Sequence, residues 1–282
     1  MSADGSVLTP VVDEDASGPG DVGFVLKAWA WIWPKALAIV LVLAIWQIVV
    51  WSGWRPEYVL PSPAETLQTL WSMLGTERFW SALQTTLIRA VIGFALALVI
   101  GTAIGILVAR IRPLRLAVGS LITGLQTMPS IAWFPLAILL FGLDEQAILF
   151  VVVLGAAPSI ANGVISGIDH VPPSFVRLGK VLGAGTFSLY RDIVLPAAMP
   201  AYVSGLTQGW AFAWRSLMAG ELLVIIAERP SLGANLEFAR QFSKAPLLLA
   251  TMLVILILGM LVDGLFSAYA RSMRRKRGLA VT

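Results

Sequence analysis

The sequence predicts an all-α membrane protein built as a bundle of about six transmembrane helices. Hydrophobic residues make up 58% of the 282 positions and charged residues 13%, whereas soluble domains average about 25% charged residues. The apolar residues gather in long runs, and a run of about 20 is what an α-helix needs to cross a bilayer. The absence of cysteine also excludes disulfides and thiol nucleophiles.

The chain divides by composition into three parts. Residues 1–26 are polar and acidic and lack the positive start of a signal peptide, so we expect a disordered tail. Residues 27–270 hold the apolar runs and form the predicted membrane domain, which includes a polar loop at 169–196. Residues 271–282 begin with the basic stretch RSMRRKRG and are predicted to form a second tail.

The predicted spans are residues 34–51, 86–109, 116–141, 147–168, 199–227 and 246–269. In the second span Gly101 and Gly105 form a G-x-x-x-G pair, which allows another helix to approach closely. The third run contains Pro129 and Pro135, which remove two backbone donors. Such breaks survive at membrane depth only where protein or a water-filled cavity surrounds them. The third run is therefore a candidate pathway wall, and a simple packing kink is the alternative.

The distribution of basic residues predicts the orientation in the membrane. With the N-terminus inside, thirteen of the 20 Lys and Arg residues fall in inner segments and five in outer segments, while Arg89 and Arg215 lie in spans. Positive charge is enriched on the cytoplasmic side of membrane proteins. Both termini and the 169–196 loop are therefore predicted to be cytoplasmic.

Four ionisable residues fall within the predicted spans: Arg89, Arg215, Glu221 and Asp263. Each needs a partner or water, because a charge at mid-bilayer costs at least about 2.5–3.5 kcal/mol. We expect Arg89 to snorkel, Asp263 to pair with the basic tail, and both to be structural. Arg215 and Glu221 lie about 240° apart around one helix and cannot pair within it. Each must therefore face another helix, a second copy of the chain or a water-filled pathway. Two hypotheses follow: Arg215 and Glu221 pair between two copies, or Arg215 meets an oxyanion that crosses the dimer interface.

The loop at 169–196 predicts two short helices. The stretch SFVRLGKVL, which begins at Ser174, is amphipathic, and Gly183 is placed as its left-handed C-cap. A second helix, TFSLYRDIVL, begins with Thr186 as N-cap, and Pro196 ends it before the fifth span. Two short helices joined at a glycine form a rigid knob that can receive force from a soluble partner. The alternative is an ordinary connector that lies flat on the membrane.

The sequence contains no motif for binding ATP itself. The pattern G-x-x-x-x-G-K-[ST] is absent, so the chain has no P-loop and its energy must come from a partner or a gradient. The only histidine, His170, lacks the companions of a metal site or catalytic triad and is expected to be a solvated loop residue. We therefore expect neither an enzyme nor a metalloprotein, and no nucleic-acid partner.

Several segments resemble a known family. Gly183, Ile193, Leu195 and Pro196 follow the pattern G-x9-I-x-L-P, the second half of the "EAA" signature of permease subunits in bacterial ABC importers. The first half differs, because Arg177-Leu178-Gly179 stands where the family usually has Glu-Ala-Ala. The runs LPSPAETLQTL, MPSIAWFPLAILLFG and AWRSLMAGELL resemble the importer branch for nitrate, aliphatic sulfonates, taurine and bicarbonate.

This resemblance implies a type I ABC importer fold with cytoplasmic coupling helices, in a multi-pass protein of the bacterial inner membrane. It implies a translocation pathway for a small oxyanion or organic anion. The implied partners are two ATP-binding cassette subunits, which bind the ATP, an extracytoplasmic solute-binding protein and a second permease copy, usually in a homodimer. The chain itself would carry no cofactor and contact only these proteins and membrane lipid.

The residues that the resemblance assigns to coupling with the ATPase lie in the second half of the 169–196 loop. They are Gly183, Ala184, Thr186, Leu189, Tyr190, Arg191, Ile193, Leu195 and Pro196. The candidate pathway residues are Arg215, Glu221, Pro129 and Pro135. The alternative function is a self-contained secondary transporter or channel, for which internal repeats or several ion-coupling carboxylates are expected. The sequence shows no matching halves and only one deep carboxylate.

Overall fold

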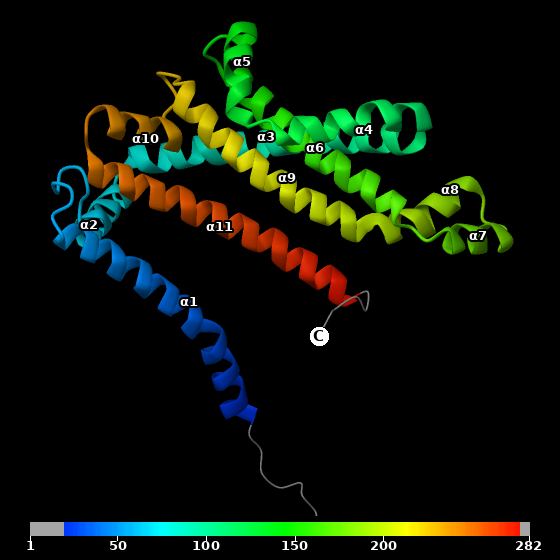
Figure 1. The fold of residues 1–282 in the computed structure, drawn as a ribbon, viewed down its shortest axis with the longest axis horizontal. Coiled ribbons are helices and arrows are strands. Elements are labelled where there is room, and N and C mark those ends of the chain that lie inside the picture. Colours follow the sequence, from blue (N-terminus) through cyan, green and yellow to red (C-terminus); the bar gives the residue numbers. More distant parts are fainter. Residues whose placement is uncertain (1–19, 277–282) are drawn as a thin grey trace, which may run out of the picture. The chain divides into compact units, whose positions relative to one another are not determined.

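The computed structural model describes residues 20–276, and every regular element in this range is a helix (Figure 1). The chain forms two compact units, Met1–Arg55 and Pro56–Thr282. The first unit contains α1 (Gly20–Trp51). Its apolar side chains, such as Ile39, Val42 and Ile45, are more than half exposed, as expected for a helix whose sides meet lipid or another chain.

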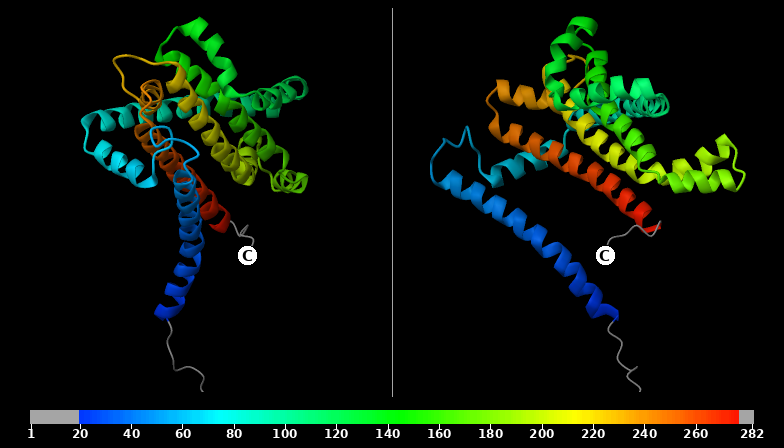
Figure 2. Two further views of the ribbon diagram at one scale, coloured as in Figure 1. Left: turned by 60° about the vertical axis from the view of Figure 1, so that its left-hand side comes forward. Right: turned by 45° about the vertical axis from the view of Figure 1, so that its right-hand side comes forward.

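The second unit contains the remaining helices. They are α2 (Pro63–Leu74), α3 (Glu77–Arg110), α4 (Arg112–Thr127), the 3-10 helix η1 (Ser130–Trp133), α5 (Phe134–Phe141), α6 (Glu145–Asp169), α7 (Pro173–Val181), α8 (Thr186–Ser188), the π-helix η2 (Leu189–Val194), α9 (Leu195–Leu223), α10 (Leu232–Gln241) and α11 (Ala245–Lys276). Within this unit α7 and α8 lie at one end of α6 and α9, and α10 lies at the other end (Figures 1 and 2). We call these the α7–α8 end and the α10 end.

The membrane character predicted from the sequence is confirmed. In residues 20–276, 4 helices are long and apolar enough to cross a bilayer, namely α1, α3, α6 and α11, and the bent pair α4 with η1–α5 makes up to 5. The predicted fifth span, α9, is also long enough at 29 residues. It falls outside this set because several of its side chains are polar, among them Ser204, Gln208 and Arg215.

Helix α6 is the centre of the second unit and packs along both α3 and α9. Glycines permit this close packing, as in other membrane bundles. A Cβ on Gly101 would lie 2.6 Å from the carbonyl oxygen of Ala157, and one on Gly105 would lie 2.7 Å from Cβ of Val164. The close approach predicted for the G-x-x-x-G pair is therefore confirmed, and its partner is α6 of the same chain.

The contact between α6 and α9 depends on a glycine on each side, Gly163 and Gly205. A Cβ on Gly205 would lie 2.7 Å from Cα of Gly163. We expect Gly205→Ala to force the two backbones apart and to lower stability by about 1–3 kcal/mol, the usual cost of overpacking. Thermal unfolding of the purified protein in detergent measures this effect. Gly264→Ala in α11 is the control, since its Cβ meets nothing within 4 Å, and an equal loss of stability there would contradict the prediction.

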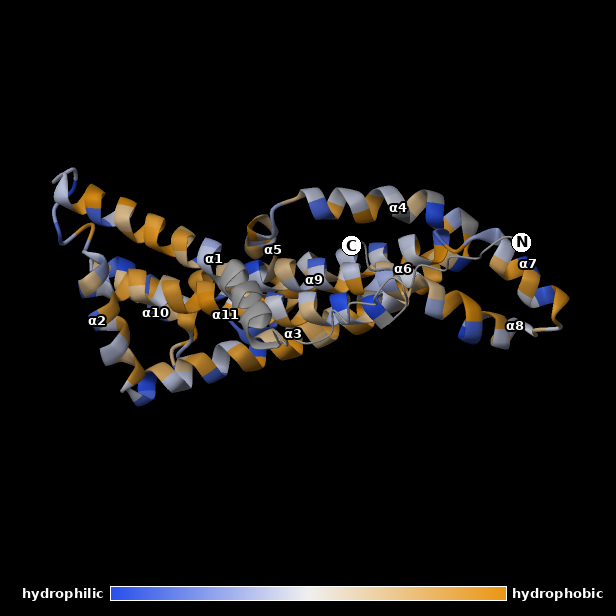
Figure 3. Ribbon diagram, turned by 90° about the horizontal axis from the view of Figure 1, so that it is seen from below, coloured by the Kyte–Doolittle hydropathy of each residue, from blue (hydrophilic) through white to orange (hydrophobic). Residues whose placement is uncertain are grey.

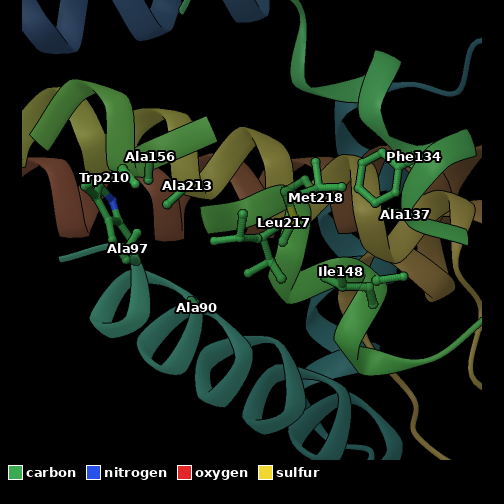
Figure 4. Packing of buried hydrophobic residues seen from close by; sticks show 14 of the residues in the cluster. Ala90, Ala97, Phe134, Ala137, Ile148, Ala156, Trp210, Ala213, Leu217 and Met218 are labelled. Carbon is green, nitrogen blue, oxygen red and sulfur yellow. The ribbon is translucent and has the colours of Figure 1, made fainter. Parts of the chain in front are cut away.

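Apolar side chains from four helices fill the core of the second unit. Figure 4 shows Leu217 and Met218 of α9 beside Ile148 of α6 and Phe134 of α5. Phe134 is 1% exposed, and a Cβ on Gly220 of α9 would lie 3.0 Å from its ring. The burial of this ring holds α5 to the bundle after the break in the third predicted span. The packed helices α3, α5, α6 and α9 thus form one continuous core that connects the α7–α8 end to the α10 end.

The third predicted span is broken, as expected. Helix α4 ends at Thr127, and the chain turns by 103° into η1 and α5. The break lies at Met128 and Pro129, where the backbone is extended. Pro135 was predicted as a second break, but it lies in the first turn of α5. A proline there removes an N–H that has no helical partner in any case, so it begins the helix and does not interrupt it.

The second half of the polar loop differs from the prediction. Helix α8 begins at Thr186, and its N-cap is Gly185, so Thr186 is a helical residue and not the cap. Pro196 does not end a helix either, because α8, η2 and α9 run on in sequence through helical backbone and Pro196 lies in the first turn of α9. The π-helix explains this continuity: the Leu195 N–H bonds to Tyr190, five residues back, and the wider turn accommodates a proline that lacks the donor.

Candidate coupling surface and membrane pathway

Gly183 terminates α7 as the sequence predicts. Its φ is 79°, in the left-handed region that glycine adopts without a steric penalty. The N–H of Gly183 bonds to the carbonyl of Lys180 at 3.0 Å, and the N–H of Ala184 bonds to that of Gly179 at 2.9 Å. This pattern of bonds is a Schellman cap, and it turns the chain sharply between α7 and α8.

The turn at Gly183 presents an apolar surface outward. We call α7, α8 and η2 (Pro173–Val194) the knob. Val181, Leu182 and Phe187 are 83%, 76% and 77% exposed, and apolar residues colour this end of the ribbon orange (Figure 3). Arg177, Lys180 and Arg191 are exposed beside them. Exposed apolar side chains among charges are typical of a surface that another protein covers.

Buried contacts hold together the two arms of the knob, which are α7 on one side and α8 with η2 on the other. Leu189 is buried, and Ile193 is half-buried. Both lie against Gly179 of α7, where a Cβ would meet their Cδ1 atoms at 2.7 and 2.5 Å. The glycine that replaces the usual alanine of the family signature therefore lets the arms pack tightly. Among the residues assigned to coupling, Leu189 and Ile193 thus shape the knob, whereas Thr186, Arg191 and Leu195 are exposed.

Two contacts join the knob end to helices other than α6 and α9. The guanidinium of Arg110, the last residue of α3, lies over the ring of Tyr190 with its carbon 4.9 Å from the ring centroid, a cation–π arrangement. Arg115 of α4 forms an ion pair with Asp169 at the end of α6. His170, the next residue, is exposed, and its Nδ1 lies 2.7 Å from the carbonyl oxygen of Ser166. The knob itself therefore contacts α3, and α4 is tied to the end of α6 that precedes the knob.

Glu221 is the centre of a buried polar cluster at the α10 end. Its carboxylate is fully buried and accepts hydrogen bonds from Arg89 Nη1 at 3.1 Å, from Thr86 Oγ1 at 2.9 Å and from the N–H of Gly233 at 3.1 Å. Thr86 in turn accepts a bond from the N–H of Leu232 at 3.0 Å. Leu232 and Gly233 are the first residues of α10, whose N–H groups have no partner within the helix. Helices α3 and α9 thus cap α10.

This cluster corrects two expectations about the charges in the spans. Arg89 does not snorkel, because its side chain is 4% exposed and lies between Glu221 and Glu145, 3.2 Å from the latter. Glu221 is not available to pair with Arg215 of another copy, because it is fully buried and already has partners in its own chain. Its partner is on another helix, as the 240° separation requires. Glu145 also accepts a bond from Arg229 at 2.6 Å, which ties the loop before α10 to α6.

Helix α10 is fixed closely by this arrangement. A Cβ on Gly233 would lie 2.4 Å from Cβ of Glu221, so the helix approaches α9 as near as glycine allows. On its outer side, hydrogen bonds from Arg240 and Gln241 lower the pKa of Glu237 to about 2. The Glu237–Arg240 pair is therefore ionised throughout the physiological pH range.

Helix α9 carries a polar face that does not pack against α6. Ser204, Gln208 and Arg215 are exposed at spacings of four and seven residues, which places them on one side of the helix. Lipid cannot hydrogen-bond such groups, and polar residues inside membranes face protein or water. The polar face of α9 is therefore a candidate pathway surface. A hollow of about 580 Å³ between α9 and α11 is lined by Ser204, Gln208 and Asp263.

Arg215 and Pro129, two of the candidate pathway residues, come together in space. Both line a cavity of about 270 Å³ at the break between α4 and η1. Glu221 and Pro135 do not line it, and the structure gives Glu221 a structural position. Sequence reasoning missed Gln126 and Ser130, which also line the cavity. Their position directly beside the predicted break at Pro129 was the signal that could have identified them.

These features together define a class of protein: a multi-pass helical membrane protein with a polar surface on one of its long helices and an exposed, partly apolar knob at one end. The model of the family "binding-protein-dependent transport system inner membrane component" matches residues 101–275. The chain belongs to this family of permease subunits.

Three curated relatives match most of the chain. The putative aliphatic sulfonates transport permease protein SsuC of Bacillus subtilis is 29% identical over 86% of this chain and 86% of its own length. The taurine transport system permease protein TauC of Escherichia coli is 26% identical over 83% and 88%. The nitrate import permease protein NrtB of Synechocystis is 29% identical over 67% and 71%.

A solved structure of the MetNI methionine ABC transporter in an inward-facing conformation has the same fold. It superposes with a TM-score of 0.59 at 19% identity, over 70% of this chain and 96% of the solved chain. At that identity the similarity establishes the fold of the bundle. The predicted importer-like fold class is confirmed.

Proposed function

We propose that this chain is the permease subunit of an ATP-driven importer for a small oxyanion or organic anion of the sulfonate, taurine, nitrate or bicarbonate type. Two copies form the pathway, two ATP-binding cassette subunits bind the α7–α8 end, and a solute-binding protein docks at the α10 end. Both termini are cytoplasmic on this proposal. The names of the curated relatives support the solute class.

The observation that carries the proposal is the exposed apolar surface of the knob. Val181 and Phe187 are more than three-quarters exposed. The helices of the knob are not among the candidate membrane spans, so lipid around a span does not account for this exposure. Burying such side chains against a partner is favourable, at roughly 25 cal/mol for each Å² of apolar surface removed from water. The nucleotide-binding subunit supplies that partner, because this chain has no P-loop of its own.

The continuous core of the second unit provides a route for coupling. Closure of the ATPase pair displaces the knob, and the knob is continuous with α9 through η2. Helix α9 reaches the α10 end, where Glu221 holds the first turn of α10. A displacement at one end is therefore transmitted along a rigid helix to the other, which exchanges outer for inner access to the pathway.

Co-purification with the co-expressed ATPase subunit tests the proposal. The unaltered chain is expected to purify with the ATPase in equal amounts, and Phe187→Asp in the knob to abolish the complex, because a central apolar contact is worth about 2 kcal/mol or more. Leu143→Asp is the matched control, since Leu143 is 60% exposed in the loop before α6, at the α10 end. A complex that survives Phe187→Asp, or solute transport by the purified chain alone, would disprove this function.

A further inference from the structure

The cavity at the α4–η1 break has the lining of an anion site. Arg215 supplies a guanidinium, Gln126 an amide and Ser130 a hydroxyl, and no Asp or Glu is among the residues that line it. Within residues 20–276 Arg215 forms no ion pair with a carboxylate. Its guanidinium carbon lies 5.6 Å from the ring centroid of Phe212. Arg215 also lines a larger hollow, of about 620 Å³, whose lining includes Asp263, but the two form no ion pair. A cation without a direct ion pair, in a protein that spans a membrane, requires an anion or water nearby.

The hydrogen-bonding groups around the cavity still have donors to offer. Gln126 uses one amide hydrogen in a 3.4 Å bond to Ser159, and an amide nitrogen carries two. Next to Arg215, the hydroxyl of Ser216 is fully buried and has no hydrogen-bond partner. It lies against the cavity wall, since a Cβ on Gly155 would be 2.5 Å from Ser216 Oγ. Buried hydroxyls without partners are rare in proteins and call for an explanation.

The size and shape of the site match a small anionic head group. A volume of about 270 Å³ admits a sulfonate, nitrate or carboxylate with part of an attached chain. The planar guanidinium presents paired donors to such oxygens. The break itself explains why the cavity exists, because α4 and α5 diverge by 103° there and leave the space that a continuous helix would fill.

We propose that Arg215, Gln126 and Ser130 form a transient binding site for the anionic head group of the transported solute. This inference rests on the proposed function and adds to it the residues that select for negative charge. Selection then occurs within the membrane as well as in the solute-binding protein. The site holds its ligand weakly, because a transport site must release what it binds.

The absence of cysteine in the chain permits a direct test. Ser130→Cys in the assembled complex introduces one thiol into the permease, and its rate of modification is measured with two methanethiosulfonates, one bearing a sulfonate and one a trimethylammonium group. We expect the sulfonate reagent to react about tenfold faster, because a unit charge within several ångströms changes local ion concentrations by that order. The ratio of the two rates cancels any change in the acidity of the thiol. Adding Arg215→Gln is expected to abolish the preference.

Thr123→Cys on α4 is the matched control, since Thr123 does not line the cavity and its hydroxyl bonds to Gly119. Its ratio is expected to be independent of Arg215. Equal rates for the Ser130→Cys variant, no reaction of that variant with either reagent, or a preference that persists with Arg215→Gln would each overturn the proposal. The labelling uses no ATP, so its outcome is separate from the outcome of the co-purification test.

Transport provides a second readout. In proteoliposomes Arg215→Gln is expected to lower the solute moved per ATP hydrolysed about tenfold, while hydrolysis stimulated by the solute-binding protein is retained and Arg215→Lys is intermediate. Arg275→Gln removes an exposed arginine near the end of α11, away from both proposed docking surfaces, and is expected to change nothing. If Arg215→Gln moves as much solute per ATP as the unaltered complex does, the anion site is disproved and the permease function still stands.

Discussion

Glu221→Gln is expected to destabilise the protein by about 3 kcal/mol, because buried Arg89 loses one of its two carboxylate partners and keeps only Glu145. The substitution also replaces one of the two carboxylate oxygens, which accept from Gly233 and Arg89, by an NH₂ group that can only donate. Since about 1 kcal/mol shifts the midpoint by roughly 2–4 °C in a chain of this size, thermal unfolding in detergent should occur about 10 °C lower.

Glu237→Gln is the matched control. Glu237 also pairs with an arginine, Arg240, but that arginine is 65% exposed, and exposed pairs contribute about 1 kcal/mol or less. The double variant Glu221→Leu with Arg89→Met is expected to recover much of the lost stability, because no unpaired charge remains in the core. Equal midpoints for Glu221→Gln and Glu237→Gln would show that the buried cluster does not stabilise the α10 end.

Gly183→Pro is expected to reduce solute uptake about tenfold or more while the protein still reaches the membrane. Proline holds φ near −65° and lacks the N–H, whereas Gly183 has a φ of 79° and donates to Lys180. The cap between α7 and α8 is then lost, and a strain of about 1–3 kcal/mol falls on the knob. Uptake of labelled solute and ATP hydrolysis by the assembled complex measure the effect together.

A pair of alanine variants isolates the backbone contribution. An added Cβ meets nothing within 4 Å at Gly183 or at Gly185, but only Gly183 has a positive φ, since that of Gly185 is −64°. Gly183→Ala is therefore expected to impair uptake several-fold and Gly185→Ala to leave it unchanged. Normal uptake by Gly183→Pro would show that the knob does not couple the ATPase to the pathway.

The features that the sequence predicted well are those that depend on neighbouring residues. Gly183 could be placed as a C-cap because it follows an amphipathic stretch, and the break at Pro129 because proline lacks a donor within an apolar run. The error at Thr186 is a shift of one residue in where the helix begins, since Gly185 is its N-cap, whereas the error at Pro196 comes from the π-turn before it. A π-turn is set by which carbonyl the chain selects five residues back, and no local residue pattern announces that choice.

The sequence by itself determined that the chain crosses a membrane, where the third run breaks and where the knob turns, because hydropathy, proline and glycine act through the local backbone. Only the tertiary structure decided the roles of the charges. Arg89 and Glu221 are 132 positions apart in the chain and yet bonded, whereas Arg215, six positions from Glu221, lines the α4–η1 cavity and forms no ion pair with Glu221. The reason is that a buried charge pairs with whatever opposite charge packing brings within a few ångströms, and sequence distance does not enter that interaction.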